Sequence, residues 1–314
     1  MKRLLGILVL CLIALPSLAQ DGQMKIMVGF GAGGVSDVLA RIYAEEFKKR
    51  LNKTVIVENR AGGSGTIATA MVSRAEPDGN TLIMVPGTHT IIPALQKLDF
   101  DPKTALTPIN LIASAPNLLI VRADAKYQDV KSLVEDAKAN PGALAYGTSG
   151  VGTTVHFMAV ILENAAGIKL NHIPYKSSGE SVQAVVGGHI PMAFSALNSA
   201  LPAIQSKQVR VLAIASEKRS GLLPDVPTFV EAGYKDVKSD TWLGLAGPAN
   251  MPKDIVGKLN DAVMESLKTA EVKKRIADLG ADPVGLGPDE FNKVILTELD
   301  KFERLARAAG LPKQ

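Results

Sequence analysis

The chain has 314 residues, of which 46% are hydrophobic, 21% charged and 4% aromatic, and its formal net charge is +4. This composition is typical of globular proteins and excludes a collagen, a disordered chain and a small disulfide scaffold. The length is sufficient for two domains with separate hydrophobic cores.

The first 19 residues have the layout of a secretory signal peptide. Two basic residues follow the initiator methionine, residues 4–16 are apolar or small, and Ser-Leu-Ala at 17–19 forms a small-residue cleavage site. We therefore expect a signal peptide over 1–19 and a mature chain that starts at Gln20, because the apolar run is short for an uncleaved anchor. No later run approaches the roughly 20 apolar residues that cross a bilayer, which predicts an exported soluble protein.

The charge and cysteine content of the mature chain narrow the function classes. Lys2 and Arg3 leave with the leader, so 33 basic side chains remain against 31 acidic ones. This even balance argues against nucleic acid or anionic lipid as a partner. The single cysteine, Cys11, also lies in the leader, so the mature chain has no thiol for a disulfide, a nucleophile or a metal site.

From Met24 onward, short β-branched or apolar runs alternate with longer segments of helical period. This alternation predicts βα units and mostly parallel sheets flanked by helices. Strands are expected at 25–30, 54–58, 81–85, 118–122, 143–146, 170–173, 191–194 and 210–215. Helices are expected at 36–51, 130–139, 153–166, 252–279 and 288–309. Ser36 and Asp129 are the predicted caps of the first two helices, and the Asp37–Arg41 pair is interpreted as helix support.

No Ser- or Pro-rich linker separates two domains, so a two-domain chain must cross between lobes inside regular structure. Crossings are expected near 122–124 and near 239–241. The predicted first lobe is then discontinuous, with residues 20–122 plus 241–314, and the second lobe comprises 123–240.

Residues 29–34 read Gly-Phe-Gly-Ala-Gly-Gly, a G-x-G-x-x-G pattern between a predicted strand and a predicted helix. In a cytosolic chain this pattern would indicate a dinucleotide site. An exported protein meets no pool of NAD(P)H, and no hydride-transfer site is evident, so we expect no cofactor. The alternatives are glycines that only permit a sharp turn, or a turn whose free N–H groups hold an anion at a helix N-terminus.

Residues 147–154 form a second glycine-rich turn before a helix, with the G-x4-G spacing of a P-loop. Thr153 stands where the phosphate-binding lysine belongs, which argues against nucleotide hydrolysis. The hydroxyls of Ser149, Thr153 and Thr154 lie beside the unsatisfied N–H groups of the helix start. Either a ligand or simple capping by threonine explains them.

Signatures of catalysis and metal binding are missing. Neither the segment 62–66 nor the segment around Ser149 completes the hydrolase pattern G-x-S-x-G, because Thr66 and Val151 stand at the closing glycine positions. The four histidines are at least 16 residues apart, without a metal-ligand spacing, so no metal site and no catalytic residue are predicted. His156, in the helix after the second turn, is either a ligand contact or a hydrogen-bonded structural histidine.

Six segments of the mature chain together resemble the solute receptors of tripartite tricarboxylate transporters, the Bug family. They lie at 28–37, 57–63, 76–82, 146–153, 173–176 and 223–228. The resemblance implies a periplasmic, two-lobed binding protein of the type II Venus-flytrap kind, whose lobes close on a small organic carboxylate. It also implies delivery to a permease with one large and one small integral membrane subunit.

The resemblance also implies a binding site. The turn at 30–36 would hold a carboxylate through backbone amides and trapped waters, and the turn at 149–154 would face it from the other lobe. The site residues assigned on this basis are Phe30, Gly31, Ala32, Gly33, Gly34, Ser36, Thr88, His89, Ser149, Gly150, Thr153, Thr154, His156, Tyr175, Ala196 and Asn198. Many relatives have an acidic residue around position 196, where this chain has alanine, which disfavours an amine-bearing ligand.

The two glycine-rich turns lead to a compatible hypothesis without the resemblance. They are the only dense clusters of free N–H donors, and neither contains Lys or Arg; oriented amides hold an anion without a formal counter-charge. We expect a monomeric binding protein for a dicarboxylate or hydroxy-dicarboxylate of four to six carbons. The alternatives are an exported enzyme that acts on a phosphorylated or nucleotide substrate, and a periplasmic sensor subunit with the same pocket.

Overall fold

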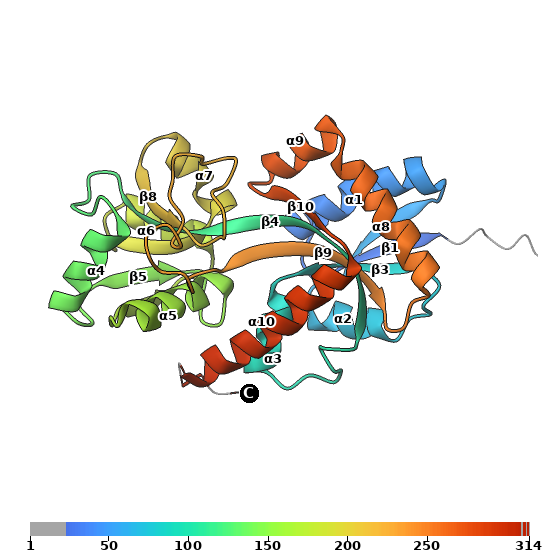
Figure 1. Ribbon diagram of the computed structural model, residues 1–314, viewed down its shortest axis with the longest axis horizontal. Coiled ribbons are helices and arrows are strands. Elements are labelled where there is room, and N and C mark those ends of the chain that lie inside the picture. Colours follow the sequence, from blue (N-terminus) through green and yellow to red (C-terminus); the bar gives the residue numbers. More distant parts are fainter. Residues whose placement is uncertain (1–22, 309, 312, 314) are drawn as a thin grey trace, which may run out of the picture.

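A computed structural model describes residues 23–308, 310, 311 and 313 of the chain, so the expected signal peptide lies outside the described residues. The strands and helices form two groups that are joined by two long strands, β4 (Leu106–Arg122) and β9 (Asp240–Pro248) (Figure 1). Among the described residues, no helix is both long and apolar enough to cross a membrane.

The first group is built on the strand order β2-β1-β3-β9-β4. Strand β1 is parallel to β2 and β3, whereas β9 is antiparallel to β3 and β4, and β10 is antiparallel to β4. The remaining strands of this group are β1 (Met24–Val28), β2 (Val55–Asn59), β3 (Thr81–Pro86) and β10 (Asp282–Leu286).

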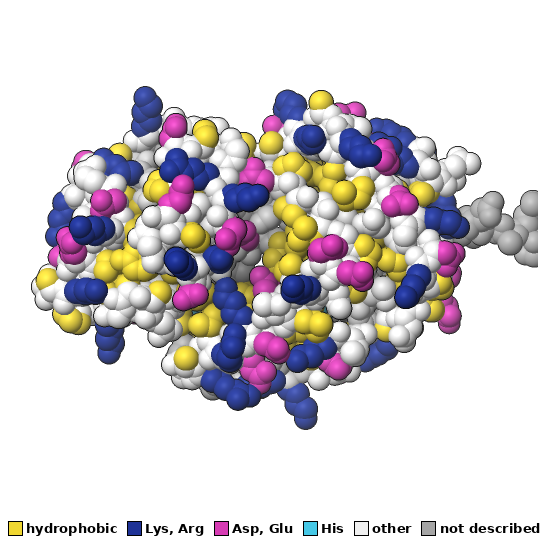
Figure 2. Space-filling view, viewed as in Figure 1, with side chains coloured by type: hydrophobic (Ala, Val, Ile, Leu, Met, Phe, Trp, Pro, Cys, Tyr) yellow, Lys and Arg dark blue, Asp and Glu magenta, His cyan; other side chains and the backbone are white. Residues whose placement is uncertain are grey.

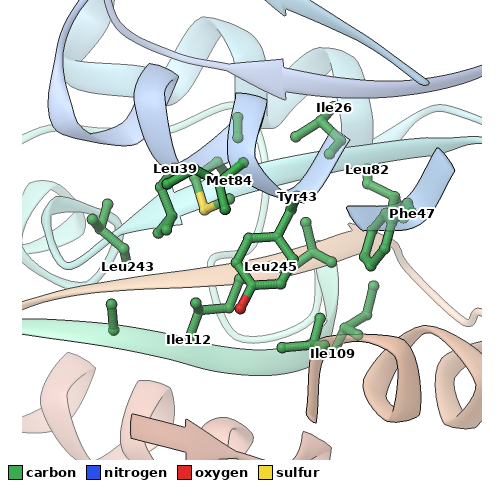
Figure 3. Close-up of a cluster of buried hydrophobic side chains, with 14 of the residues drawn as sticks. Ile26, Leu39, Tyr43, Phe47, Leu82, Met84, Ile109, Ile112, Leu243 and Leu245 are labelled. Atoms are coloured by element: carbon green, nitrogen blue, oxygen red, sulfur yellow. The ribbon is translucent and has the colours of Figure 1, made fainter. Parts of the chain in front are cut away.

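Helices cover both faces of this first sheet. One face packs against α1 (Val35–Leu51), α8 (Lys253–Leu267) and α9 (Ala270–Asp278). Figure 3 shows this core, in which the rings of Tyr43 and Phe47 from α1 lie among aliphatic side chains of the strands. The other face packs against α2 (Thr66–Ser73), α3 (Thr88–Leu95) and α10 (Pro288–Ala308), with a short 3-10 turn, η1 (Gly63–Gly65), before α2.

The second group is built on β6-β5-β7-β4, in which β5 is parallel to β6 and β7, and β4 is antiparallel to β7 and β8. Helices α4 and α5 pack on one face and α6 and α7 on the other. The elements are α4 (Val130–Ala139), β5 (Ala145–Thr148), α5 (Thr154–Ala166), β6 (Asn171–Pro174), α6 (Ser178–Val186), β7 (Met192–Ala196), α7 (Leu197–Gln205) and β8 (Val209–Ile214).

Strand β4 changes partner within its length. Residues up to Pro116 pair with β9, and residues from Asn117 onward pair with β7 and β8. A division into two lobes remains a prediction, and this pairing would move its first boundary from 122 back to about 116. The second boundary at 240 coincides with the start of β9.

The predicted α/β class with flanking helices is confirmed, but the expectation of mostly parallel sheets needs correction. Of the nine strand pairings in the described part of the chain, five are antiparallel. All five involve β4 or β9, whose buried residues on both faces give no period-two pattern to find in the sequence.

Two predicted helix boundaries also differ from the structure. The segment 252–279 forms two helices rather than one, because Thr269 caps α9 by accepting a hydrogen bond from Val272 N. The first helix begins at Val35 with Gly34 at its N-cap, so Ser36 is not the cap. Asp129 does cap α4, where it forms a capping box with Ser132.

Candidate functional site

Turn 1, residues 29–36, connects β1 to α1 and is anchored by a buried carboxylate. Asp37 Oδ2 accepts a hydrogen bond of 2.9 Å from Gly33 N, and its Oδ1 accepts one of 3.0 Å from Asn59 on β2. Arg41 binds both oxygens of Asp37, at 3.0 and 2.9 Å. These bonds, those from Arg41 foremost, hold the pKa of Asp37 below its usual value, so the turn is anchored by an ionised carboxylate.

Turn 1 presents backbone N–H groups at the start of α1. Gly33 has φ +81°, which favours glycine, and the space next to its Cα is open. Within the described residues, the amides of Gly34, Val35 and Ser36 make no hydrogen bond, and no side chain caps the helix. They lie at the positive end of the helix dipole and are available to an anion.

A small cavity of about 20 Å³ lies behind turn 1, large enough for a single water. Phe30, Gly65, Thr88 and His89 line it, and the buried Thr88 Oγ1 has no partner within the described residues. His89 Nε2 lies 3.3 Å from Pro102 O, and burial lowers the pKa of His89 to about 4, so the ring is neutral and donates to that carbonyl.

Gly65 is a residue of this site that the sequence reasoning missed. A Cβ on Gly29 would lie 2.6 Å from Gly65 Cα, so turn 1 and η1 meet backbone to backbone. The signal for this contact in the sequence is a third glycine-rich segment at 62–65, one of the two glycine-serine segments that do not complete G-x-S-x-G.

Turn 2, residues 147–154, connects β5 to α5 and is held by hydroxyl and imidazole groups. Gly150 N donates to Thr148 Oγ1 at 3.1 Å, and Thr153 Oγ1 donates to Gly150 O at 2.8 Å. Thr153 is also the N-cap of α5, which supports capping by threonine, one of the two explanations considered for the hydroxyls of this turn. Within the described residues, the amides of Val151, Thr153 and Thr154 make no hydrogen bond, so this helix start is also open to an anion.

His156 lies beneath turn 2 and is buried. Its Nδ1 accepts a hydrogen bond of 3.1 Å from Gly152 N, which requires the neutral tautomer with a proton on Nε2. Its ring stacks on His172 at 4.3 Å, and His172 stacks on Tyr146 at 4.9 Å. Burial, with a smaller contribution from His172, lowers the pKa of His156 to about 4. Of the two roles considered for His156, the geometry favours the structural one.

The remaining predicted residues lie in three places. Tyr175 flanks turn 2, since its N donates to Thr148 O at 3.0 Å and its ring lies beside Gly147. Ala196 ends β7 opposite Asn117. The backbone of Asn198 instead packs against Gly280, which follows α9, where a Cβ on Gly280 would lie 2.8 Å from Asn198 Cα.

Turn 2 also touches the first group of elements. A Cβ on Gly152 would lie 2.3 Å from Leu95 Cδ1 at the end of α3, the helix that begins at Thr88. Beside this contact, the rings of Phe157 on α5 and Phe302 on α10 are 5.2 Å apart. Neither turn contains Lys or Arg, and the described residues hold no group of three or more side chains suited to a metal ion.

Comparison with known proteins identifies this architecture. The family model described as "Tripartite tricarboxylate transporter family receptor" (TctC) matches residues 39–311. The periplasmic binding protein BugD is 31% identical, with 94% of this chain and 99% of that chain covered and a TM-score of 0.74.

Two further solved structures contain carboxylates. MatC from Rhodopseudomonas palustris, with bound malate, is 30% identical over 90% of this chain and 98% of that chain, with a TM-score of 0.72. Rpa4515 from R. palustris, with adipate, is 28% identical over 93% and 98%, with a TM-score of 0.77. Together with the family match, these likenesses show that the chain belongs to the TctC family of periplasmic solute-binding receptors, which includes the Bug proteins.

Proposed function

We propose that this receptor captures a dicarboxylate or hydroxy-dicarboxylate of four to six carbons between turns 1 and 2 and delivers it to a tripartite transporter. One observation carries the proposal: two helices begin with amides that have no partner among the described residues, in turns that contain no cationic side chain. The ligand's carboxylates would take hydrogen bonds from these amides and from the hydroxyls of turn 2.

The energetics suit an anion. Each helix start contributes about 0.3–1 kcal/mol to a bound negative charge, and more when the site is partly buried. The donors are held in place by Asp37 in turn 1 and by His156 and Thr153 in turn 2, so little reorganisation accompanies binding. Two such turns match a ligand with an acidic group at each end, which a sugar lacks.

An amino acid would need an acceptor for its ammonium group, since an unpaired buried charge costs several kcal/mol. Asp240 is the candidate acceptor. Thr241 contacts Thr154 of turn 2 at 3.1 Å, and neighbouring strand residues point to opposite faces, so Asp240 points away from turn 2. It lies with Glu298 and Lys301 in a hollow of about 270 Å³ beside α10.

This hollow lies on the side of β9 that carries α10, and Figure 2 shows charged side chains of both signs around the depression between the two groups of elements. Burial is the main cause that raises the pKa of Asp240 to about 7. Because Asp240 points away from turn 2 into this hollow, we do not assign it to the carboxylate site.

The biological setting is part of the same proposal. The leader is removed near Ala19, and the mature protein is a periplasmic monomer without a cofactor that docks on one large and one small membrane subunit. MatC with malate and Rpa4515 with adipate support the ligand class, and the family supports a receptor rather than an enzyme.

Calorimetric titration with malate, succinate and adipate, against aspartate and glutamate, tests the ligand class. Gly33→Val and Thr153→Val should abolish binding in folded protein, because a side chain at Gly33 blocks the amides and the Thr153 hydroxyl braces turn 2. Gly142→Val is the matched control, since this glycine also has positive φ and open space but lies at the other end of β5. Tighter binding of the amino acids, or unchanged affinity in both turn variants, would contradict the proposal.

A further inference from the structure

Turn 2 is tied by hydrogen bonds to the strand that joins the two groups of elements. Thr154 Oγ1 lies 3.1 Å from Thr241 Oγ1 on β9, and Thr154 O accepts a hydrogen bond of 3.0 Å from Ser239 Oγ. These contacts span 87 and 85 residues of sequence. The turn is therefore positioned by the connecting strand as well as by its own helix.

Asn117 completes this network from β4. Its side chain is fully buried, Nδ2 donates to Ser239 O at 2.5 Å, and Oδ1 accepts from Thr241 Oγ1 at 3.3 Å. Because an amide oxygen only accepts, the single Thr241 proton goes to Asn117. Thr154 must then donate to Thr241, so the hydrogen bonds run in one direction, from Thr154 through Thr241 to Asn117.

The network stands where the two strands change partners. Asn117 is the first residue of β4 to pair with β7, and the preceding residue, Pro116, pairs with Asp240. Ser239 N also donates to Ala215 O at 2.7 Å, so Ser239 anchors β9 to the second group just before the crossing. Relative rotation of the two groups about this crossing would change the distances within the network.

Trp242, which follows Thr241 on β9, links this strand to the first group of elements. Trp242 Nε1 donates to Glu298 Oε2 at 2.7 Å, and the same oxygen accepts from Thr90 Oγ1 of α3 at 2.9 Å. Gly87 N, at the start of α3, donates to Trp242 O at 3.0 Å. Thr241 and Trp242 thus connect turn 2 and the start of α3 to adjacent positions of one strand.

We propose that Asn117, Ser239 and Thr241 are positioning residues that hold the amides of turn 2 against the connecting strands and so couple ligand capture to the arrangement of the two groups. This inference rests on the proposed carboxylate site. Besides helix α5, the bonds of the Thr154 side chain to Thr241 and of its carbonyl to Ser239 hold the Thr154 amide in its direction. A ligand on that amide therefore favours the arrangement in which the network is complete.

The test compares Thr241→Val with Thr241→Ser in full-length mature protein. Thr241→Val keeps the shape and removes the hydroxyl, and it should raise the Kd for malate or adipate about tenfold, as loss of a buried hydrogen bond implies. Thr241→Ser should restore the wild-type Kd. Thr107→Val is the matched control, because the Thr107 hydroxyl also links β4 to the end of β9, but at Pro248 O and Met251 N, away from the crossing.

Amide hydrogen exchange of ligand-free protein gives a readout that does not depend on the ligand. Exchange of the hydrogen-bonded amides of Gly152, His156 and Phe157 should be faster in Thr241→Val than in the wild type and unchanged in Thr107→Val. Should Thr241→Val fail to fold, Ser239→Ala removes the bond to Thr154 O and carries the same expectations. Exchange rates in Thr241→Val that equal those of the wild type, or a rise in Kd in Thr107→Val as large as in Thr241→Val, would overturn this inference. Failure of the wild type to bind any carboxylate would instead overturn the proposed function.

Discussion

Turns 1 and 2 both lead from a strand into a helix through several glycines, yet different chemistry holds each of them in place. Turn 1 depends on the ionised carboxylate of Asp37, which is bonded to Gly33 N and paired with Arg41. Turn 2 depends on neutral groups, with Thr148 bonded to Gly150 N and the His156 ring bonded to Gly152 N. A similar backbone shape therefore has two different sensitivities to mutation and pH.

The difference follows from where the anchoring side chains lie. Asp37 is on the first turn of α1, where a carboxylate is stabilised by the helix dipole and its charge is balanced by Arg41 one helical turn later. His156 is buried within the second group of elements and stacks on His172. A charged ring there would lose its hydration and destabilise the folded chain. We expect the Asp37 anchor of turn 1 to tolerate acid and the His156 anchor of turn 2 to be lost in acid.

Among the substitutions at neutral pH, the largest effect is expected from Asp37→Ala. The substitution leaves Gly33 N, Asn59 and Arg41 without their shared partner, and it should lower the free energy of unfolding by about 2–4 kcal/mol. Affinity for the carboxylate should also fall, because turn 1 loses its anchor. Urea unfolding and calorimetry measure the two effects, and wild-type values in both would show that the carboxylate does not support the turn.

Lowering the pH should weaken the fold through the two histidines whose pKa burial lowers to about 4, His89 and His156. Below about pH 6.5 the unfolded chain binds protons at these residues that the folded chain does not. The free energy of unfolding therefore decreases as the pH is lowered from about 6.5 to about 4. The loss is at most about 3 kcal/mol for each histidine. Asp37, whose pKa is lowered, keeps its contribution throughout this range.

Urea unfolding between pH 8 and pH 4 checks this expectation. A variant His156→Leu should show a shallower decline than the wild type, whereas the exposed His189→Gln should match the wild type. A decline that is identical in His156→Leu and the wild type would place the acid sensitivity elsewhere.

At neutral pH, His156→Leu should have a smaller effect than Asp37→Ala. It leaves one neutral donor, Gly152 N, without its acceptor, which costs about 1–2 kcal/mol of unfolding free energy. Exchange of the Gly150 and Gly152 amides in turn 2 should accelerate while that of the Gly33 amide in turn 1 stays unchanged. Equal acceleration in both turns would mean that the two anchors are not independent.

The smallest effect is expected from Arg41→Gln. The Arg41 side chain is 51% exposed, and exposed ion pairs contribute little, so the Kd should change by less than about twofold. Gly33 N and Asn59 still bind Asp37 in this variant. If Arg41→Gln impaired binding as much as Asp37→Ala, the ion pair itself rather than the hydrogen bond to Gly33 would hold turn 1.

The local features of these turns could be read from the sequence. Strand, glycine and helix order predicted both turns, the Asp37–Arg41 spacing predicted their ion pair, and capping by a threonine was one of two explanations considered for turn 2. These features depend on residues within a few positions of one another, where backbone geometry decides which groups meet.

Features that join distant segments could not be read in this way. The contact of Thr154 with Thr241 and the packing of Asn198 on Gly280 each depend on how the two groups of elements are placed. The antiparallel course of β4 and β9 was missed for a related reason, since strands buried on both faces carry no alternating pattern. The role of His156 remained open because only the fold shows that its Nδ1 meets Gly152 N.

The most direct test of the account is a crystal structure of the mature protein with malate or adipate. We expect one carboxylate within about 3 Å of the amides at Gly34 to Ser36 and the other group of the ligand at a similar distance from the amides of turn 2, with no Lys or Arg in contact. A ligand bound away from either turn, or held by a cationic side chain, would contradict the claim that two amide-rich helix starts form the site.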